Sequence, residues 1–179
     1  MLESLITSKT RIKLLMKFFI NSNTTAYLRN LATEFDESTN SIRQELNRFE
    51  KANLIESKTE QNKKIYKANI NHPYFTDIHR LLLKYVGIDE IIDNVVNRVG
   101  ELEKAYIIND FAQGNPGNII DLLLIGNNFD QDFLHKLVRT AEENVSFKIK
   151  YITVSEDEST NYIPDQTKAL LVWSAGKRT

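Results

Sequence analysis

The hydrophobic positions in the first third of the chain form short segments with helical spacing, separated by polar residues. In the first segment, Ser8 is placed to cap a helix with apolar positions at Ile12, Leu15, Phe18 and Phe19. The cap-prone run 21–25 ends that helix. A short second helix is expected next, with an inner side of Leu28, Leu31, Ala32 and Phe35. Residues 36–38 then predict a tight turn and a cap for a third helix.

The third predicted helix separates its apolar and polar residues onto opposite sides. With Ile42 at 0° and an advance of about 100° per residue, Leu46 falls near roughly 40° and Phe49 near roughly −20°, which predicts one buried stripe. The far side and its flanks carry only amides and cations: Asn40, Arg43, Gln44, Asn47, Arg48 and Lys51. Glu45 and Glu50 lie nearer the buried edge. Such a surface is often only solvated, but a solvated face usually mixes both signs of charge.

Two short strands joined by a basic loop are expected after this helix, within residues 54–69. The loop is predicted to carry Lys58, Lys63, Lys64 and Lys67, either to contact phosphates or as a merely soluble hairpin tip. Three helices followed by a basic hairpin predict a winged helix-turn-helix with its third helix in the major groove. Side-chain amides can hydrogen-bond adenine, Arg can hydrogen-bond guanine, and Lys can neutralise a phosphate. The predicted DNA-binding residues are Thr39, Asn40, Ser41, Arg43, Gln44, Asn47, Arg48, Lys51, Lys58, Lys63 and Lys64.

The remaining pattern predicts two linker helices and a small α/β unit. A helix over 75–86 is interrupted by Gly87, and an apolar stripe then follows at Ile88, Ile91, Ile92, Val95, Val96 and Val99. That stripe packs either on the following sheet, which is the simpler assumption, or on a partner chain. Two strands around a turn at 113–118, a helix over 130–142 and strands at 147–154 and 169–173 complete an α+β chain. The expected division is 1–72, a DNA-binding domain; 73–100, linker helices; and 101–179, the α/β domain.

Composition and charge narrow the functions. The 179 residues contain no cysteine, which excludes disulfides and thiolate chemistry, and His72, His79 and His135 are too scattered to be assigned to a metal. Residues 1–72 hold 12 Lys and Arg against 8 Asp and Glu, a net of +4, whereas residues 73–179 hold 11 against 16, a net of −5. Chance explains small asymmetries, but this one favours a polyanion partner for the first part only. With no apolar run near the ~20 residues of a membrane span and no signal peptide, we expect a soluble cytoplasmic protein.

Residues 38–55 resemble the recognition helix of bacterial winged-helix repressors, the arsenical-repressor-like and related groups. In these families, a sequence motif that contains leucines, glutamate, lysine, alanine and glycine precedes the wing. Asn53 stands where glycine is usual, a mild departure because Asn tolerates the left-handed conformation at a helix C-terminus. The resemblance implies a homodimer on double-stranded DNA. The metal ligands of the arsenical type are absent, so metal sensing is not implied.

Residues 106–124 resemble the signature of minimal nucleotidyltransferases, but most of its catalytic residues are replaced. Active members have Gly-Ser, then a basic residue, then Asp-x-Asp on a strand. This chain has Asn109 and Asp110 at the Gly-Ser position, Gln113 for the cation and Ile119 for the first acid, and it keeps only Asp121. The later strand at 147–152 has no third acid. In sequence order, residues 40–126 are similar to winged-helix regulators fused to such a domain.

We therefore predict a sequence-specific DNA-binding transcriptional regulator that is not an enzyme and needs no cofactor, with a nucleotidyltransferase-like domain for dimerisation or sensing. Nucleotidyl transfer needs clustered carboxylates to hold Mg²⁺, and Asp121 alone is vestigial. The alternative is an active, antitoxin-like nucleotidyltransferase that modifies a partner protein. A third hypothesis is that the domain binds a nucleotide without catalysis and uses it to alter the affinity for DNA. The sequence gives no preference for this hypothesis. It also does not identify the operator.

Overall fold

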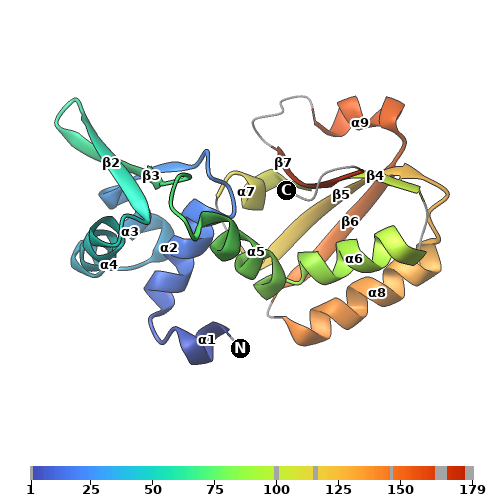
Figure 1. The fold of residues 1–179 in the computed structure, drawn as a ribbon, viewed down its shortest axis with the longest axis horizontal. Coiled ribbons are helices and arrows are strands. Elements are labelled where there is room, and N and C mark those ends of the chain that lie inside the picture. The colour runs from blue at the N-terminus through green and yellow to red at the C-terminus, as the bar shows by residue number, and fades with distance from the viewer. Residues whose placement is uncertain (1, 99–100, 115–116, 146, 164–168, 176–179) are drawn as a thin grey trace. The chain divides into compact units, whose positions relative to one another are not determined.

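The computed structural model describes residues 2–98, 101–114, 117–145, 147–163 and 169–175. The chain is a mixed α+β protein that divides into two compact units, residues 1–82 (unit 1) and 83–179 (unit 2) (Figure 1). The boundary falls within helix α5 (Phe75–Tyr85), inside the segment predicted as a linker. Most of α5 thus belongs to unit 1, and the next helix, α6 (Ile88–Arg98), belongs to unit 2.

The helices of unit 1 follow the predicted order. After the short α1 (Leu2–Leu5), the unit contains α2 (Lys9–Phe19), α3 (Leu28–Phe35) and α4 (Thr39–Lys51). Ser8 caps α2 as predicted, since its hydroxyl accepts a hydrogen bond from the Arg11 N–H at 3.2 Å. Asp36 adopts the left-handed conformation (φ 53°) and ends α3.

The sheet of unit 1 is an antiparallel hairpin with a third strand beside it. Strands β2 (Ile55–Glu60) and β3 (Lys63–Ala68) form the hairpin, and β1 (Thr25–Tyr27) pairs with β3, giving the order β1-β3-β2. Gln61 and Asn62 connect the strands, both with positive φ (45° and 62°), as a tight two-residue hairpin turn requires. The hairpin was predicted, whereas β1 was not.

A continuous apolar core joins α2, α3 and α4. The predicted inner positions of the three helices are buried except Leu28, which is half-buried, and the largest fully enclosed side chains include Phe18, Phe19, Leu31, Ile42 and Leu46. The buried Lys17 ammonium bonds the Glu34 carboxylate at 2.8 Å and so ties α2 to α3. Phe75 of α5 packs on Phe19, with ring centroids 5.6 Å apart.

Unit 2 is built on a four-stranded sheet of order β6-β5-β4-β7. Strand β4 (Glu101–Ile108) runs antiparallel to β5 (Ile119–Asn127) and to β7 (Ala169–Ser174). Strand β6 (Lys148–Val154) runs parallel to β5, which requires the connecting helix α8 (Gln131–Asn144). Gly126 allows β4 and β5 to approach closely, because a Cβ at this position would lie 2.1 Å from the Glu101 carbonyl oxygen.

Different elements cover the two faces of this sheet. Helices α6 and α8 pack side by side on one face, and α9 (Glu156–Tyr162) lies on the other (Figure 1). The stripe on α6 packs within its own unit, as the simpler assumption held: four of its members are at most 5% exposed, namely Ile88, Ile91, Ile92 and Val95. Val96 is 40% exposed, and Val99 lies outside the described residues.

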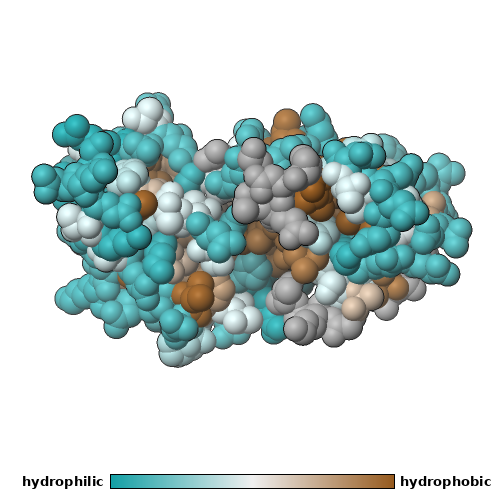
Figure 2. Space-filling model, turned by 90° about the horizontal axis from the view of Figure 1, so that it is seen from above, coloured by the Kyte–Doolittle hydropathy of each residue, from teal (hydrophilic) through white to brown (hydrophobic). Residues whose placement is uncertain are grey.

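The face seen in Figure 2 is mostly hydrophilic, and the hydrophobic residues visible on it form small groups. Across the described ranges, no helix combines the length and the apolar character needed to cross a bilayer.

Candidate functional sites

The exposed face of α4 carries the side chains that the periodicity placed outward. Ile42, Leu46 and Phe49 are at most 3% exposed, which fixes the rotation of the helix about its axis as predicted. Ser38 caps the helix, its hydroxyl accepting from the Ser41 N–H at 3.1 Å. The exposed residues of the helix are Thr39, Asn40, Arg43, Gln44, Asn47, Arg48 and Lys51, and Ser41 is half-buried. Seven of the predicted site residues thus share one accessible surface.

Glu45 leaves this face and becomes the centre of a buried ion-pair network. It is 6% exposed, and its carboxylate accepts from Arg11 Nε at 2.9 Å, Arg48 at 2.7 Å and the Ser8 hydroxyl at 3.3 Å. Burial by itself would raise the pKa of Glu45. The hydrogen bond and charge of Arg11, with Arg48 and Ser8, outweigh burial and hold the pKa below its ordinary value. The carboxylate therefore stays ionised but faces inward.

Glu50, the second acid of α4, is also held by partners. It is half-buried and accepts from the Ser57 hydroxyl at 2.5 Å and from Lys64 Nζ at 2.7 Å. Burial would raise its pKa, but the hydrogen bonds from Lys64 and Ser57 prevail and lower it. Neither acid in Thr39–Lys51 is therefore exposed, and the free charges on this helix surface are all positive.

The lysines of the hairpin lie in strands, not in a loop, so the prediction of their position was wrong. The strands continue through the polar residues because the cross-strand register pairs Glu60 with Lys63 at the tip. Three of the four lysines have acidic partners: Lys58 with Glu60 at 2.5 Å, Lys64 with Glu50, and Lys67 with Glu56 at 3.4 Å. Lys63 alone has no ion-pair partner among the residues that the structure describes. The hairpin thus offers less free positive charge than its lysine count suggested.

A cavity beside the hairpin brings in residues that the sequence analysis missed. It has a volume of about 600 Å³ and lies between the start of α3 and the hairpin turn. Its lining combines cations, amides and aromatic rings: Tyr27, Leu28, Arg29, Asn30, Asn62, Lys63, Lys64 and Tyr66. Arg29 and Asn30 are exposed at the start of α3. Only the fold places them beside the predicted Lys63 and Lys64.

The segment that resembles a nucleotidyltransferase signature lies around the end of β4 and the start of β5. Asn109 has φ 60°, the left-handed conformation that glycine adopts most easily, and it begins the short helix α7 (Asn109–Ala112). Asp110 and Gln113 are exposed. The predicted turn at 113–118 includes residues 115 and 116, which lie outside the described residues.

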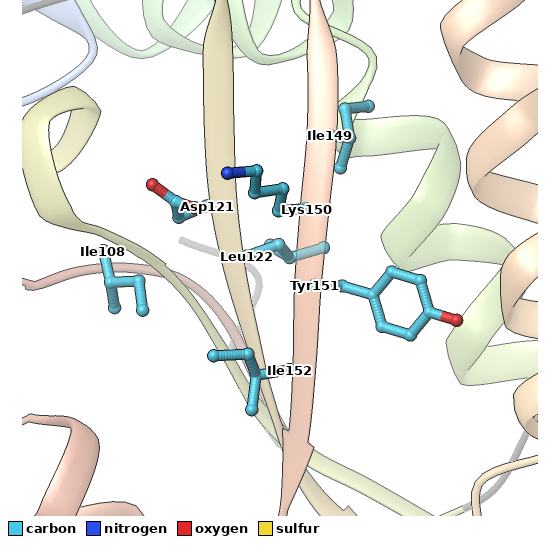
Figure 3. Close-up of a pocket in the computed structure, with 7 residues that line it drawn as sticks. All are labelled: Ile108, Asp121, Leu122, Ile149, Lys150, Tyr151 and Ile152. Atoms are coloured by element: carbon cyan, nitrogen blue, oxygen red, sulfur yellow. The ribbon is translucent and has the colours of Figure 1, made fainter.

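Asp121 lies at a cavity of about 360 Å³ on the α9 side of the sheet. Its neighbour in register is Lys150 on β6, the strand that was predicted to lack a third acid. Figure 3 shows both side chains on the same face as Ile108 and Ile152, while Ile149 and Tyr151 point to the other face. Ile119, where the first acid would be, also belongs to this face by strand alternation and is 44% exposed. An isoleucine and a lysine thus lie around one aspartate on this face.

These donors do not fit a catalytic divalent metal. No group of three or more His, Asp or Glu able to hold a metal ion occurs in the part of the chain that the structure describes. The histidines have separate structural surroundings: a ring nitrogen of His79 lies 2.7 Å from the Phe19 carbonyl oxygen, and burial lowers its pKa. His72 Nδ1 accepts from the Tyr74 N–H at 3.1 Å, and His135 is exposed on α8.

Comparison with known proteins gives only distant likenesses. No family model matches the chain, and no curated protein does. Reduced HlyU from Vibrio cholerae N16961 is 16% identical with a TM-score of 0.37, over 46% of this chain and 82% of that one. A candidate nucleotidyltransferase from Sulfolobus solfataricus is 21% identical with a TM-score of 0.38, over 55% of this chain and 86% of that one. At these scores, the two likenesses carry no assignment of function.

Proposed function

We propose that unit 1 is a winged helix-turn-helix domain that binds double-stranded DNA, and that the protein is a transcriptional regulator. The observation that carries the proposal is the exposed, acid-free face of α4, from which Glu45 and Glu50 are both withdrawn into ion pairs. A helix that presents amides and cations alone complements the base edges and phosphates of a major groove. The excess positive charge of the first 72 residues supports the same partner.

The residues of this face take different roles in the proposal. Asn40, Gln44 and Asn47 meet base edges through their amides, and Arg43 through its guanidinium. Thr39 and Ser41 at the helix start, with Arg48 and Lys51, contact the backbone, where they set register and affinity. Lys58, Lys63 and Lys64 contact phosphates from the hairpin, and Lys63 is the strongest of them because its charge is unpaired within the described residues.

Fluorescence anisotropy on DNA from the protein's own promoter region tests this proposal. Gln44→Ala and Asn47→Ala are each expected to weaken specific binding by about 1–3 kcal/mol and to relax sequence preference. Lys51→Ala is expected to weaken binding to all sequences and to reduce the salt slope by about one. Lys136→Ala on the exposed surface of α8 is the matched control. If Gln44→Ala and Asn47→Ala bind as the wild type does, α4 is not the reading surface.

We further propose that unit 2 does not catalyse nucleotidyl transfer. The reaction needs Mg²⁺ held by clustered carboxylates, whereas Asp121 has the ammonium-bearing Lys150 beside it in register. The alternative function, modification of a partner protein, is favoured by the cavity that retains Asp121. Incubation with labelled nucleotides, Mg²⁺ and a lysate distinguishes the two. Label on a protein that disappears with Asp121→Asn would support the enzyme, and no label with any nucleotide would support a non-catalytic unit.

The protein is expected to act as a homodimer, because helix-turn-helix proteins usually bind two half-sites. The buried stripe of α6 is occupied within unit 2, so a dimer would have to use another surface. Light scattering with and without DNA measures this directly: two chains per duplex are expected, and one chain per duplex would contradict it.

A further inference from the structure

The cavity at Asp121 is large enough to hold a small ligand. Its volume of about 360 Å³ is within the range of small-molecule pockets. Two opposite charges, Asp121 and Lys150, project from adjacent parallel strands into the same space (Figure 3). Ile108 and Ile152 line it beside them.

The two charges lie side by side without satisfying each other. Their backbones are partners in register, so roughly 4.8 Å separates the strands. Even so, within the described residues neither side chain has an ion pair or hydrogen bond. Other lysines of the same unit do pair: Lys104 with Glu156 at 2.5 Å and Lys148 with Glu142 at 3.1 Å. A carboxylate and an ammonium group are therefore both available to a ligand.

The charge balance of the cavity selects among ligand classes. One anion and one cation sum to zero, which complements a molecule with one group of each sign. A nucleoside triphosphate would bring several negative charges to a single cation, close to Asp121 and in a half of the chain with a net charge of −5. The apolar lining adds a preference for a hydrocarbon substituent, because Ile152 is 39% exposed and a ligand would cover it.

We propose that this cavity binds a free amino acid with an apolar side chain. Asp121 accepts hydrogen bonds from the α-ammonium group, Lys150 donates to the α-carboxylate, and the side chain lies on Ile108 and Ile152. The site lies wholly in unit 2 and uses no residue of the proposed DNA-binding face. The amino-acid proposal can therefore fail while the DNA-binding proposal holds, and the DNA-binding proposal can fail while the amino-acid proposal holds.

Titration calorimetry of the full chain with L-leucine, L-isoleucine and L-valine is the first test. Saturable binding of at least one is expected. For that amino acid, the N-acetyl derivative, which lacks the ammonium group, and the amide, which lacks the carboxylate, should each bind at least about tenfold more weakly. Absence of saturation by all three at millimolar concentrations overturns the proposal, and so does equal binding of the blocked derivatives. MgATP is the polyanion probe, and its binding in an Asp121-dependent manner would show a retained nucleotide site instead.

Charge variants test the assigned orientation. Asp121→Asn and Lys150→Met should each weaken binding at least about tenfold, whereas the double exchange Asp121→Lys with Lys150→Asp should recover part of the loss by reversing the ligand. Asp132→Asn and Lys136→Met on the exposed side of α8 match these changes in charge and should leave binding intact. Circular dichroism checks that each variant is folded. If Asp121→Asn unfolds, ligand binding by Lys150→Met still tests the site, because Lys150 is exposed on the edge strand β6. Unchanged binding by folded Lys150→Met would refute the assignment.

Discussion

Removal of the Glu45 carboxylate tests the network that holds α4 against α2. Glu45→Ala deletes the group that bonds Arg11, Arg48 and Ser8, and Glu45→Gln keeps its shape but removes its charge. Both variants leave the exposed amides and cations of α4 in place. The change in the free energy of unfolding therefore reports on the network itself.

The expected loss in the free energy of unfolding depends on how far each side chain of the network is exposed to solvent. Breaking a fully buried ion pair costs about 3–5 kcal/mol, because one charge is left without compensation. Here the Glu45 side chain is buried, but the side chains of Arg11 and Arg48 are 34% and 61% exposed and can be rehydrated. We therefore expect about 2 kcal/mol for Glu45→Ala and about 1 kcal/mol for Glu45→Gln, which still accepts one hydrogen bond.

The cost should depend on pH in a definite direction. Burial alone would raise the pKa of Glu45, but Arg11, Arg48 and Ser8 lower it below 4.5, so the folded state binds its proton less readily than the unfolded chain. The stabilisation is complete above the unfolded pKa and is lost as the pH falls through the folded pKa. The difference between wild type and Glu45→Gln is therefore largest near neutral pH and shrinks below about pH 4.5.

Urea titrations followed by circular dichroism at pH 7 and at acid pH measure this difference. With a urea slope of about 2 kcal/mol/M, the transition of unit 1 in Glu45→Ala should shift by about 1 M at pH 7. Glu56→Gln is the control, because Glu56 is 47% exposed and its 3.4 Å pair with Lys67 should contribute less than about 0.5 kcal/mol. A Glu45→Gln cost equal to that of Glu56→Gln, or one that persists undiminished at acid pH, would refute the assigned network.

Three further substitutions test the packing in both units, each by urea unfolding. Gly126→Ala should cost about 3 kcal/mol or more, since the new Cβ would lie 2.1 Å from the Glu101 carbonyl oxygen at φ 155°; a cost below 1 kcal/mol would contradict that approach. Ser38→Ala should cost about 1 kcal/mol through loss of the cap at Ser41, with Ser38→Asp as the control that retains it. Leu46→Ala should cost about 2–5 kcal/mol, and a smaller value would mean that the inner side of α4 is not buried.

The periodic features of this fold were predictable from the sequence because each depends on local geometry. The stripe of Ile42, Leu46 and Phe49 determined which side of α4 is buried, and the same period placed Glu45 and Glu50 away from the exposed face. Asn53 was expected to tolerate the left-handed conformation, and its φ is 56°. These outcomes need only helical spacing and backbone sterics.

The missed elements depend on partners distant in sequence or lack an apolar pattern. Strand β1 has only three residues, begins at the last residue of the polar run 21–25, and exists through its pairing with β3, where Thr25 is opposite Lys67. Helix α9 has no buried residue, so no hydrophobic period marks it. Its start did carry a local signal, a capping box of Ser155 and Glu158. The lysine pairs of the hairpin were likewise hidden. Lys67 lies opposite Glu56 through the cross-strand register, and Lys64 bonds Glu50 of helix α4, which only the fold brings beside it.

The proposed DNA-binding surface on α4 and the proposed amino-acid site in unit 2 differ in net charge. The difference arises because Lys150 lies beside Asp121. This placement depends on the parallel pairing of β5 and β6, which the pattern of either strand alone does not give. On α4, Arg43 and Lys51 carry positive charges without an acidic partner among the described residues, so affinity for a polyanion there should fall steeply with salt as counterions are released. In the unit 2 cavity, one positive and one negative group meet a ligand of zero net charge, and screening acts only on two short-range contacts. Salt should therefore weaken DNA binding by orders of magnitude while amino-acid binding changes little, because the two units face ligands of different net charge.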